Sequence, residues 1–338
     1  MSTYRYNKVK VFVLICISWL IVYFNGLDLL REPLFWNHEY NNRKISYSIA
    51  GRNTRSLVTE KKKKPVMYTF YMKQKEHLLN DRDSQEHIEM LRTWKHYWEE
   101  IGWETQVLTK EDAMRHPKFE TYNDIINQLK VTTYDHYCFY RWLAMVTIGG
   151  GWMSDYDVIP LMPNLGDFFK FSRRQSEIEK IAAAHETIGE DDLWLPNNGR
   201  FTSFCSAVPC LMSGSAQEWD RVIDHIITQY APKKKHRHFS DMEGLIKYAT
   251  EESSSIFIEN RVYPWVEMTS NEYDTKIIDC EKYRGQIAWH FSHSSEKAAL
   301  DLSFIPSRIH HAQKYASRAW FIHYFMNRWK AYCLPTFK

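Results

Sequence analysis

The chain reads Gly-Gly-Gly-Trp-Met-Ser-Asp-Tyr-Asp-Val from Gly149 to Val158, and this stretch is the most informative part of the sequence. An apolar, helix-like segment ends in the three glycines, and a short β-like run follows them. In an extended strand, residues two apart point to the same side. We therefore expect Asp155 and Asp157 to face one common site at the end of a strand.

Two carboxylates that face one site repel each other unless a cation lies between them. The usual cation is a hard divalent metal ion with oxygen ligands, and such ions commonly carry a phosphorylated substrate. We interpret Asp157 as the main metal ligand and Asp155 as a ligand of the metal, of a ribose or of both. The glycines allow the backbone to pass close to a ligand, or they form a tight turn, and both roles can hold together.

The segment that leads into the glycines adds context to this pair. It reads Tyr-Asp-His-Tyr-Cys-Phe-Tyr-Arg-Trp-Leu-Ala-Met over residues 134–145. With the aspartates it resembles the pattern Asp-x-x-Arg-x-x-x-Leu-x-x-x-Gly-Gly-x-Tyr-x-Asp-x-Asp of glycosyltransferases with the DXD sugar-binding region. Golgi α-mannosyltransferases and large glucosylating bacterial toxins belong to these families. Arg141, Gly150, Asp155 and Asp157 fall in register with the pattern.

The resemblance implies a GT-A-like α/β fold, with a mixed, mainly parallel sheet flanked by helices. It also implies metal-dependent transfer of a sugar, with retention, from a UDP- or GDP-linked donor to a glycan, protein or lipid acceptor, with Mn²⁺ or Mg²⁺ as cofactor. In the same way it places Tyr68, Thr69 and Phe70 on the nucleotide side of a first strand and Gly150 beside the donor. Such enzymes often take a third metal ligand or a pyrophosphate contact from a segment near the C-terminus, and His290 is the candidate here.

Two further charged residues complete the expected site. Arg141 can pair with Asp155 or reach the phosphates as a planar fork, and a structural ion pair is the alternative. Ser240 or Asp241 caps a helix. Asp241 is also an acidic group that can meet the donor sugar or the acceptor hydroxyl. We therefore count Asp157, Asp241 and Arg141 as candidate catalytic residues.

Composition sets the limits of this interpretation. The 338 residues suffice for one sizeable α/β domain with an anchor or stem. A net charge of +3 gives no electrostatic case for a nucleic-acid partner. Aromatic residues make up 15% of the chain, which suits a carbohydrate-handling surface and a packed core equally well. Five cysteines follow the N-terminal apolar run, and their pairing cannot be read from the sequence.

The N-terminal region predicts a membrane anchor. A basic start precedes an apolar run from Val11 to Phe24, which reaches about 21 Å as a helix and becomes long enough only when extended to Leu30. A cleaved signal peptide is the alternative. We expect a cytoplasmic tail at 1–10, a signal anchor at 11–30, a stem at 31–65 and the catalytic domain at 66–338. This predicts a single-pass type II protein in the Golgi or another secretory lumen.

The remaining pattern predicts alternating strands and helices, which favour a parallel α/β sheet. Strands are expected at 66–71, 103–108, 181–185, 204–212 and 285–291. Helices are expected at 84–101, with Ser84 as a possible N-cap, at 215–230 and at 316–329.

Two other function classes compete with the glycosyltransferase. A haloacid-dehalogenase-type phosphatase also uses Asp-x-Asp at a strand end, but it requires an apolar strand directly before the first aspartate, where this chain has glycines. A catalytically inactive carbohydrate-binding relative is the other class. Only Cys138 favours it, because this cysteine stands where the family pattern has an aspartate. We interpret Cys138 as a buried core residue.

Overall fold

The computed structural model describes residues 64–72, 81–172, 195–206, 208–263, 269–270, 276–278, 280–292 and 317–337. All of them belong to the same structural unit. The predicted tail and anchor, most of the stem and the predicted strand at 181–185 lie outside these residues. A search of the described helices for a stretch able to span a bilayer found none.

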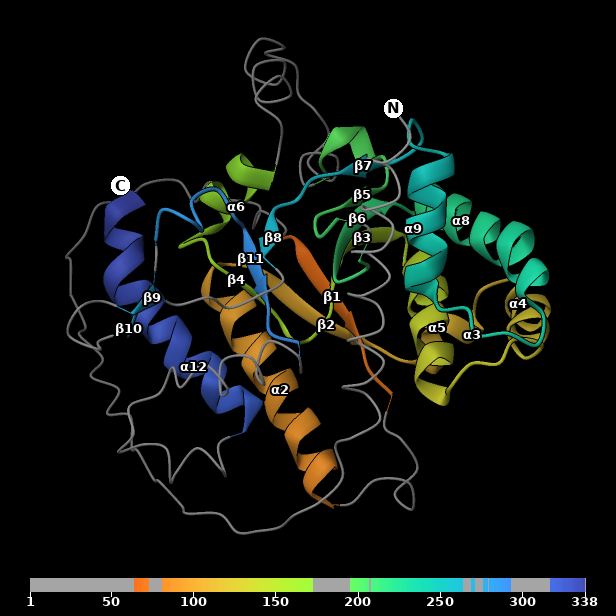
Figure 1. Ribbon diagram of the computed structural model, residues 1–338, viewed down its shortest axis with the longest axis horizontal. Coiled ribbons are helices and arrows are strands. Elements are labelled where there is room, and N and C mark those ends of the chain that lie inside the picture. Colours follow the sequence, from red (N-terminus) through yellow and green to blue (C-terminus); the bar gives the residue numbers. More distant parts are fainter. Residues whose placement is uncertain are drawn as a thin grey trace, which may run out of the picture. The chain divides into compact units, whose positions relative to one another are not determined.

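A six-stranded mixed sheet lies at the centre of the unit (Figure 1). Its order is β2-β1-β3-β6-β5-β7. Strand β1 is parallel to β2 and β3, and β5 is parallel to β7, whereas β6 runs antiparallel to both of its neighbours. The prediction of a mixed, mainly parallel sheet in an α/β fold is confirmed. Its strands are β1 (Val66–Phe70), β2 (Glu104–Leu108), β3 (Gly150–Ser154), β5 (Thr202–Ser203), β6 (Leu211–Ser215) and β7 (Phe257–Ile258).

A smaller sheet of three strands follows the order β4-β11-β8. It contains β4 (Val158–Pro160), β8 (Val262–Tyr263) and β11 (Ala288–His290), and β11 is antiparallel to β4 and parallel to β8. A separate antiparallel pair joins β9 (Thr269–Ser270) to β10 (Lys276–Ile277). The chain passes from the central sheet to the smaller one between β3 and β4, so the segment 155–157 lies at this transition.

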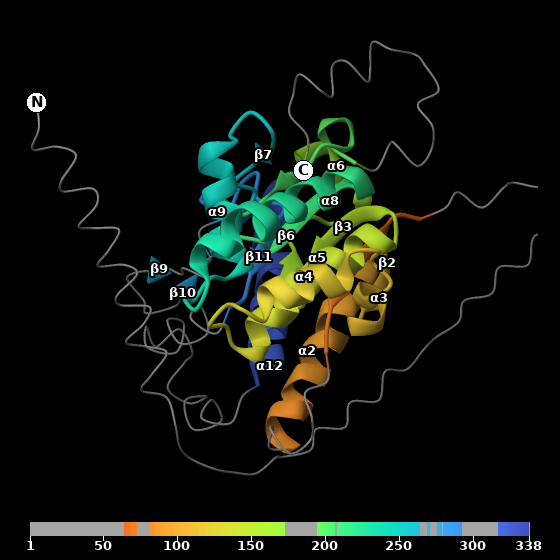
Figure 2. The same ribbon diagram turned by 90° about the vertical axis from the view of Figure 1, so that its right-hand side faces the viewer.

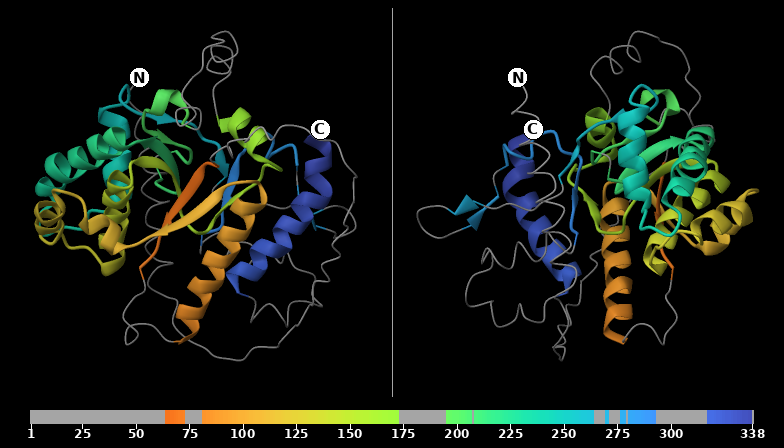
Figure 3. Two further views of the ribbon diagram at one scale, coloured as in Figure 1. Left: turned by 180° about the vertical axis from the view of Figure 1, so that it is seen from behind. Right: turned by 45° about the vertical axis from the view of Figure 1, so that its right-hand side comes forward.

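Helices cover both faces of the central sheet. On one face, α2 (Asp81–Glu100) packs against α12 (Arg318–Arg328), and Figure 3 shows the two side by side. Figure 2 looks onto the other face, where α4, α5, α8 and α9 lie in front of the strands. The bounds of the remaining helices are α3 (Lys110–Met114), α4 (Phe119–Ile126), α5 (Thr133–Thr147), α6 (Leu165–Ser172), α8 (Ala216–His225) and α9 (Asp241–Glu251).

Side chains of β1 alternate between the two hydrophobic cores on either side of the sheet. Met67 belongs to the core that contains the tryptophans of α2, whereas Tyr68 and Phe70 pack against the core formed by α5, α8 and α9. This period of two is the pattern expected of a strand buried on both faces.

The helix α2 is fixed to the transition between the two sheets by two buried tryptophans. Trp94 donates from Nε1 to Oγ of Ser154 at 2.7 Å, and Trp98 donates from Nε1 to the carbonyl of Val158 at 3.0 Å. Buried indole N–H groups need such partners. Because Ser154 and Val158 flank the segment 155–157 on both sides, α2 holds the ends of that segment in place.

Most predicted elements are present with shifted bounds. The strands at 66–71, 103–108 and 285–291 correspond to β1, β2 and β11. The helix at 215–230 begins as α8, with Ser215 as its N-cap, and continues in a π-helical turn over Ile226–Tyr230. The C-terminal helix is α12, followed by a π-helical turn over Trp329–Cys333.

Two local predictions were wrong. The helix α2 begins at Asp81, so Ser84 lies inside its first turn and is not the N-cap. Most of the predicted strand at 204–212 is instead a reversal between β5 and β6, and only its last two residues belong to β6. Ser206 has a positive φ of 49° there, and Pro209 lacks the N–H that a ladder needs. The apolar residues of this segment are buried by the turn and not by a continuous strand.

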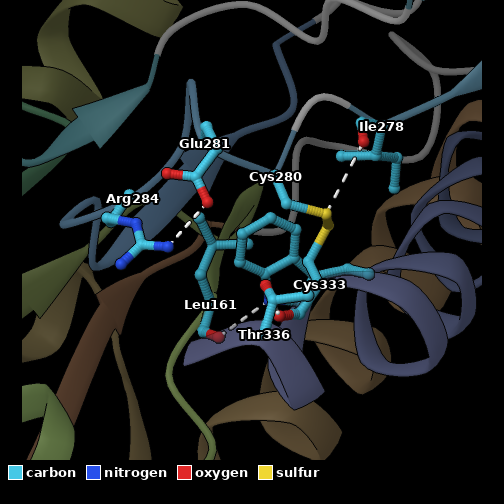
Figure 4. Close-up of a disulfide and its surroundings, with 8 residues drawn as sticks. Leu161, Ile278, Cys280, Glu281, Arg284, Cys333 and Thr336 are labelled. Carbon is cyan, nitrogen blue, oxygen red and sulfur yellow. Dashed lines mark hydrogen bonds and ion pairs between the residues drawn. A yellow bond between two sulfur atoms is a disulfide. The ribbon is translucent and has the colours of Figure 1, made fainter. Parts of the chain in front are cut away.

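A disulfide joins Cys280 to Cys333 and ties the end of the C-terminal helical segment to the loop before β11 (Figure 4). The Cα atoms of the two cysteines are 5.2 Å apart. Nearby, Trp329 donates from Nε1 to the carbonyl of Leu161 at 2.9 Å. Both links hold the segment that contains α12 against the small sheet.

The two glycines at the start of β3 serve the backbone in different ways. Gly149 and Gly150 both have positive φ, at 98° and 81°, a region that favours glycine. A Cβ on Gly150 would lie 2.4 Å from the backbone nitrogen of Ala216 and 2.7 Å from the carbonyl oxygen of Gly214. A Cβ on Gly149 would meet nothing within 4 Å. Gly150 therefore permits the close approach of β3 to the junction between β6 and α8.

Substitution of these two glycines by alanine separates conformational strain from a steric clash. We expect Gly149→Ala to lower the free energy of unfolding by about 1–2 kcal/mol, the cost of a positive φ for a residue with a Cβ. Gly150→Ala should cost on the order of 3–5 kcal/mol, because backbone atoms must also move. Denaturant unfolding of both variants measures the difference. Equal losses would contradict the role given to Gly150.

Candidate functional site

The two aspartates of the opening stretch lie in a tight turn between β3 and β4. The N–H of Val158 donates to the carbonyl of Asp155 at 3.0 Å and closes the turn. The N–H of Asp155 donates to the carbonyl of Cys210 at 2.8 Å, which fastens the turn to the β5–β6 connection. The expectation of an extended strand across Asp155 and Asp157 was therefore wrong, but the expectation that their carboxylates converge is confirmed.

His290 reaches the same place from β11. Residue 290 pairs with Val158 in the small sheet, and the N–H of Phe291 donates to the carbonyl of Asp157 at 2.8 Å. The Nε2 atom of His290 lies 3.3 Å from Oδ1 of Asp157. One ligand atom from each of Asp155, Asp157 and His290 can be chosen so that all three lie within 4.8 Å of one another. The structure thus brings together the three predicted metal ligands.

Arg141 connects this group to a second, buried carboxylate. From α5, its Nη1 atom donates to Oδ1 of Asp155 at 2.6 Å. Its Nε and Nη2 atoms both donate to Oδ2 of Asp241, at 3.1 and 2.6 Å, and Trp142 donates from Nε1 to the same oxygen at 3.0 Å. Arg141 therefore forms the structural ion pair that we gave as the alternative to a phosphate contact. Ser240 is the N-cap of α9, so the carboxylate of Asp241 does not cap the helix and instead accepts hydrogen bonds from Arg141.

Local sequence explains why α5 presents Arg141 in this position. Thr132 is the N-cap of α5, and it exchanges hydrogen bonds with Asp135 in a capping box. Cys138 and Arg141 are both buried on this helix, at 8% and 7% exposure. The interpretation of Cys138 as a buried core residue is confirmed.

Arg318 is a component of the site that the sequence analysis missed. Its Nη1 atom lies 3.1 Å from Oδ2 of Asp157, its Nε atom lies 3.7 Å from Glu86, and its side chain is 2% exposed. It occupies the first position of α12, directly after the N-cap Ser317. A basic residue in a first turn opposes the helix dipole. This unusual placement is the one signal that could have indicated a buried partner.

Burial and charge pairing set the protonation of the site. Burial raises the pKa of Asp155 to about 6, although the Arg141 guanidinium opposes the shift. Burial alone would lower the pKa of His290, but the charge of Asp157 and its hydrogen bond outweigh burial and raise the pKa well above its usual value. The two carboxylates of the turn thus lie beside three cationic side chains, Arg141, Arg318 and His290.

The donor set fits a divalent metal ion. Two carboxylates and an imidazole suit Mn²⁺, and ligand atoms about 2.1–2.3 Å from one ion lie roughly 3–4.5 Å from each other. The separation of 3.3 Å between His290 and Asp157 falls in this range. The side chains of Asp155 and Asp157 are 29% and 15% exposed, so an ion can reach them from solvent. Such an ion would replace the contact between His290 and Asp157 with two ligand bonds.

The other predicted cofactor residues lie at some distance along the strands. Tyr68 and Phe70 face the α5 side of the sheet and Thr69 is buried, and no hydrogen bond among the described residues connects them to the two carboxylates. Gly150 begins β3, whereas Asp155 follows its last residue, which separates them by roughly 16 Å of extended chain. The observed contact of Gly150 is with backbone, not with the carboxylates.

Tyr71, the residue directly after β1, contacts the turn through the ring of Tyr156. It follows the last residue of β1, and its ring centroid is 6.2 Å from that of Tyr156 in an edge-to-face arrangement. The Tyr156 hydroxyl is hydrogen-bonded to Nδ1 of His87 at 2.9 Å. These rings border the two carboxylates at the same edge of the sheet.

Comparison with known proteins gives a family match without an assigned activity. A family model described as "Domain of unknown function (DUF8765)" matches residues 32–188, which is less than half of the chain. This range includes the turn with Asp155 and Asp157 but ends before Asp241, His290 and Arg318. Searches of the curated proteins and of the solved structures found no match.

Removal of the carboxylate of Asp241 should destabilise the fold strongly. Asp241→Ala leaves the guanidinium of Arg141 buried without its main partner, and we expect a loss of about 3–5 kcal/mol in the free energy of unfolding. The matched control is Glu281→Ala, which removes an exposed ion pair to Arg284 that Figure 4 shows. That control should cost no more than about 0.5–1 kcal/mol. Similar losses in both variants would contradict the structural role of Asp241.

Metal binding should depend on pH in a defined direction. His290 must lose its proton before it can ligate a metal, and so must Asp155 below about pH 6. The affinity of the full-length chain for Mn²⁺ should therefore rise between about pH 5 and pH 8, approaching tenfold per pH unit for each proton released. Titration calorimetry at several pH values measures this rise. An affinity that stays flat or falls would contradict the assignment.

Proposed function

We propose that this chain is a metal-dependent glycosyltransferase that transfers a sugar, with retention of configuration, from a UDP- or GDP-linked donor to a glycan, protein or lipid acceptor. One observation carries the proposal: Asp155, Asp157 and His290 converge at the end of a sheet strand beside Arg141. This arrangement suits a divalent metal and a diphosphate better than it suits a purely structural ion pair, because the carboxylates are partly open to solvent.

The position of the site in the sheet supports a nucleotide-sugar donor. Strands β1 and β3 are parallel, so their carboxyl ends lie at one edge, and ligands of open α/β sheets commonly bind at such edges. Asp155 follows β3 and Tyr71 follows β1. A donor would thus lie across both strand ends, with the metal ligands on one side and the aromatic rings of Tyr71 and Tyr156 on the other. This placement also favours the GT-A-like interpretation of the sheet.

A bound Mn²⁺ or Mg²⁺ would supply Lewis-acid neutralisation of the diphosphate leaving group. The residues of the chain provide and orient the ligands for this ion. Asp155, Asp157 and His290 provide the ligands, and Asp241 fixes Arg141 so that one guanidinium nitrogen remains directed at Asp155. Arg318 holds Asp157 from the opposite helix layer. We assign Asp241 a positioning role, because its side chain is only 3% exposed.

Transfer with retention is consistent with the pairing of the three carboxylates with cationic side chains. In a retaining transfer on one face, the acceptor hydroxyl forms the new glycosidic bond while the sugar–phosphate bond breaks, and an oxygen of the departing diphosphate takes the hydroxyl proton. This route requires no side-chain base. Asp155, Asp157 and Asp241 are each paired with a cationic side chain, so none of these three is placed as a free base.

The location proposed for this activity is a secretory lumen, with the N-terminal segment 11–30 as a type II membrane anchor. The disulfide between Cys280 and Cys333 supports an oxidising compartment, because such bonds are rare in the cytosol. Glycan, protein or lipid acceptors are all accessible there. The segment 11–30 itself lies outside the described residues.

The proposal is tested with the full-length chain, Mn²⁺ and a panel of UDP- and GDP-sugars, by the release of nucleoside diphosphate. We expect turnover with at least one donor. Asp157→Ala and His290→Ala should each reduce it by at least about a hundredfold, since the charge stabilisation they support contributes several kcal/mol. Asp124→Ala, which removes an exposed carboxylate of α4, should leave turnover unchanged.

Three outcomes would contradict the proposal. No turnover across the donor panel by a folded chain would remove the enzyme assignment. Release of phosphate from a simple aryl phosphate, without use of any nucleotide sugar, would favour a phosphatase. Equal activity in Asp157→Ala and in Asp124→Ala would show that the turn does not form the active site.

A further inference from the structure

A second cluster of metal-ligating side chains lies directly behind the carboxylates. Cys205 and Cys210 belong to the reversal between β5 and β6, and His290 comes from β11. The ligand atoms of these three residues lie within 4.8 Å of one another. The two cysteines are 4% and 0% exposed. Buried thiols and an imidazole from two separate elements thus converge on one position.

The backbone around the thiols is held by hydrogen bonds. The N–H of Val208 donates to the carbonyl of Cys205 at 2.8 Å, and the N–H of Cys210 donates to the carbonyl of Val208 at 2.8 Å. The N–H and the hydroxyl of Ser206 both donate to Oδ1 of Asn260, which lies outside the reversal, at 3.1 and 2.9 Å. These hydrogen bonds fix the described residues of the reversal, and both sulfur atoms lie beside His290.

The chemistry of this cluster differs from that of the carboxylate group. Thiolate and imidazole ligands favour Zn²⁺ and other thiophilic cations, whereas carboxylate ligands favour Mn²⁺ and Mg²⁺. Three protein ligands are sufficient for a zinc site that keeps a fourth position open. Cys205 and Cys210 are both free thiols in this structure, in contrast to the disulfide-bonded Cys280 and Cys333.

We propose that Cys205, Cys210 and His290 form a binding site for a thiophilic divalent cation such as Zn²⁺, and that this site shares His290 with the carboxylate site. On binding, any protons held by the two sulfur atoms and by the imidazole pass to solvent, and three bonds to the metal form. The thiolate site stands independently of the proposed glycosyltransferase function. Its effect on Mn²⁺ rests on the proposed carboxylate site.

Sharing of His290 makes the two sites antagonistic. The ring is anchored in β11 by the pairing of residue 290 with Val158, and the carbonyl of Cys210 accepts from the N–H of Asp155 at 2.8 Å. The two clusters are thus joined through both backbone and side chain. A cation held by the two thiolates takes the imidazole from Asp155 and Asp157, so Zn²⁺ should weaken Mn²⁺ binding by at least about tenfold.

Co²⁺ is the spectroscopic probe for the thiolate site in the full-length chain. We expect the intense ultraviolet absorption of thiolate-to-cobalt charge transfer, which Zn²⁺ then displaces. Cys205→Ser and Cys210→Ser should each remove most of it. Cys138→Ser is the matched control, because it changes a third buried free thiol that lies outside the cluster. X-ray absorption at the cobalt edge of the unsubstituted chain counts sulfur ligands independently of how the variants fold, and two are expected.

Several results would overturn the thiolate site. The first is an unsubstituted chain that shows no charge-transfer absorption with Co²⁺, and the second is absorption that survives in both serine variants. The third is a cobalt edge spectrum without sulfur ligands. The fourth is a Cys205–Cys210 disulfide, detected by mass spectrometry in the isolated protein.

The sharing of His290 is tested by Mn²⁺ binding, followed by electron paramagnetic resonance with and without one equivalent of Zn²⁺. Zn²⁺ should weaken Mn²⁺ binding in the unsubstituted chain and have no effect in the variant that combines Cys205→Ser with Cys210→Ser. Unchanged Mn²⁺ binding beside bound Zn²⁺ would overturn the sharing. A chain that gives the cobalt signal but binds no Mn²⁺ at Asp155 and Asp157 would contradict the proposed function and leave the thiolate site standing.

Discussion

The charge of two aspartates held in one tight turn is the constraint on which the structure around the candidate site depends. Asp155 and Asp157 cannot both be ionised at the end of β3 unless cations surround them. Three elements far apart in the sequence supply these cations: Arg141 comes from α5, His290 from β11 and Arg318 from α12. The turn is therefore the point at which α5, α12 and the small sheet are connected to one another by charge pairs.

Arg141 extends this constraint into the core. Its guanidinium serves both Asp155 and the buried Asp241, so α5, the turn and the start of α9 are connected by one side chain. Buried ion pairs of this kind contribute little net stability, but the loss of one partner is costly. The network is thus better explained by the orientation it gives to the site than by the stability it gives to the fold. A metal that binds the turn enters a site whose ligands are already oriented.

Local sequence patterns predicted the strands β1, β2 and β11, the helices α2, α8 and α12, and the convergence of Asp155 and Asp157. The family resemblance, and not a local pattern, suggested that His290 joins them. The predictions failed where tertiary contacts override local pattern. The apolar run around Cys205 and Cys210 resembles a strand, but its side chains are buried by a reversal that contains Ser206 at positive φ. Arg318 could not be placed, because its partner Asp157 is distant in the sequence and only the packing of α12 against α2 brings them together.

The metal assignment can be tested by a crystal structure of the full-length chain with Mn²⁺ and UDP. We expect an anomalous peak for manganese about 2.1–2.3 Å from one atom of each of Asp155, Asp157 and His290, with the diphosphate oxygens completing the shell. The contact between His290 and Asp157 would be replaced by metal bonds, while Arg141 would remain paired with Asp241. Manganese bound elsewhere, or no manganese while both aspartates keep their arginine partners, would contradict the account.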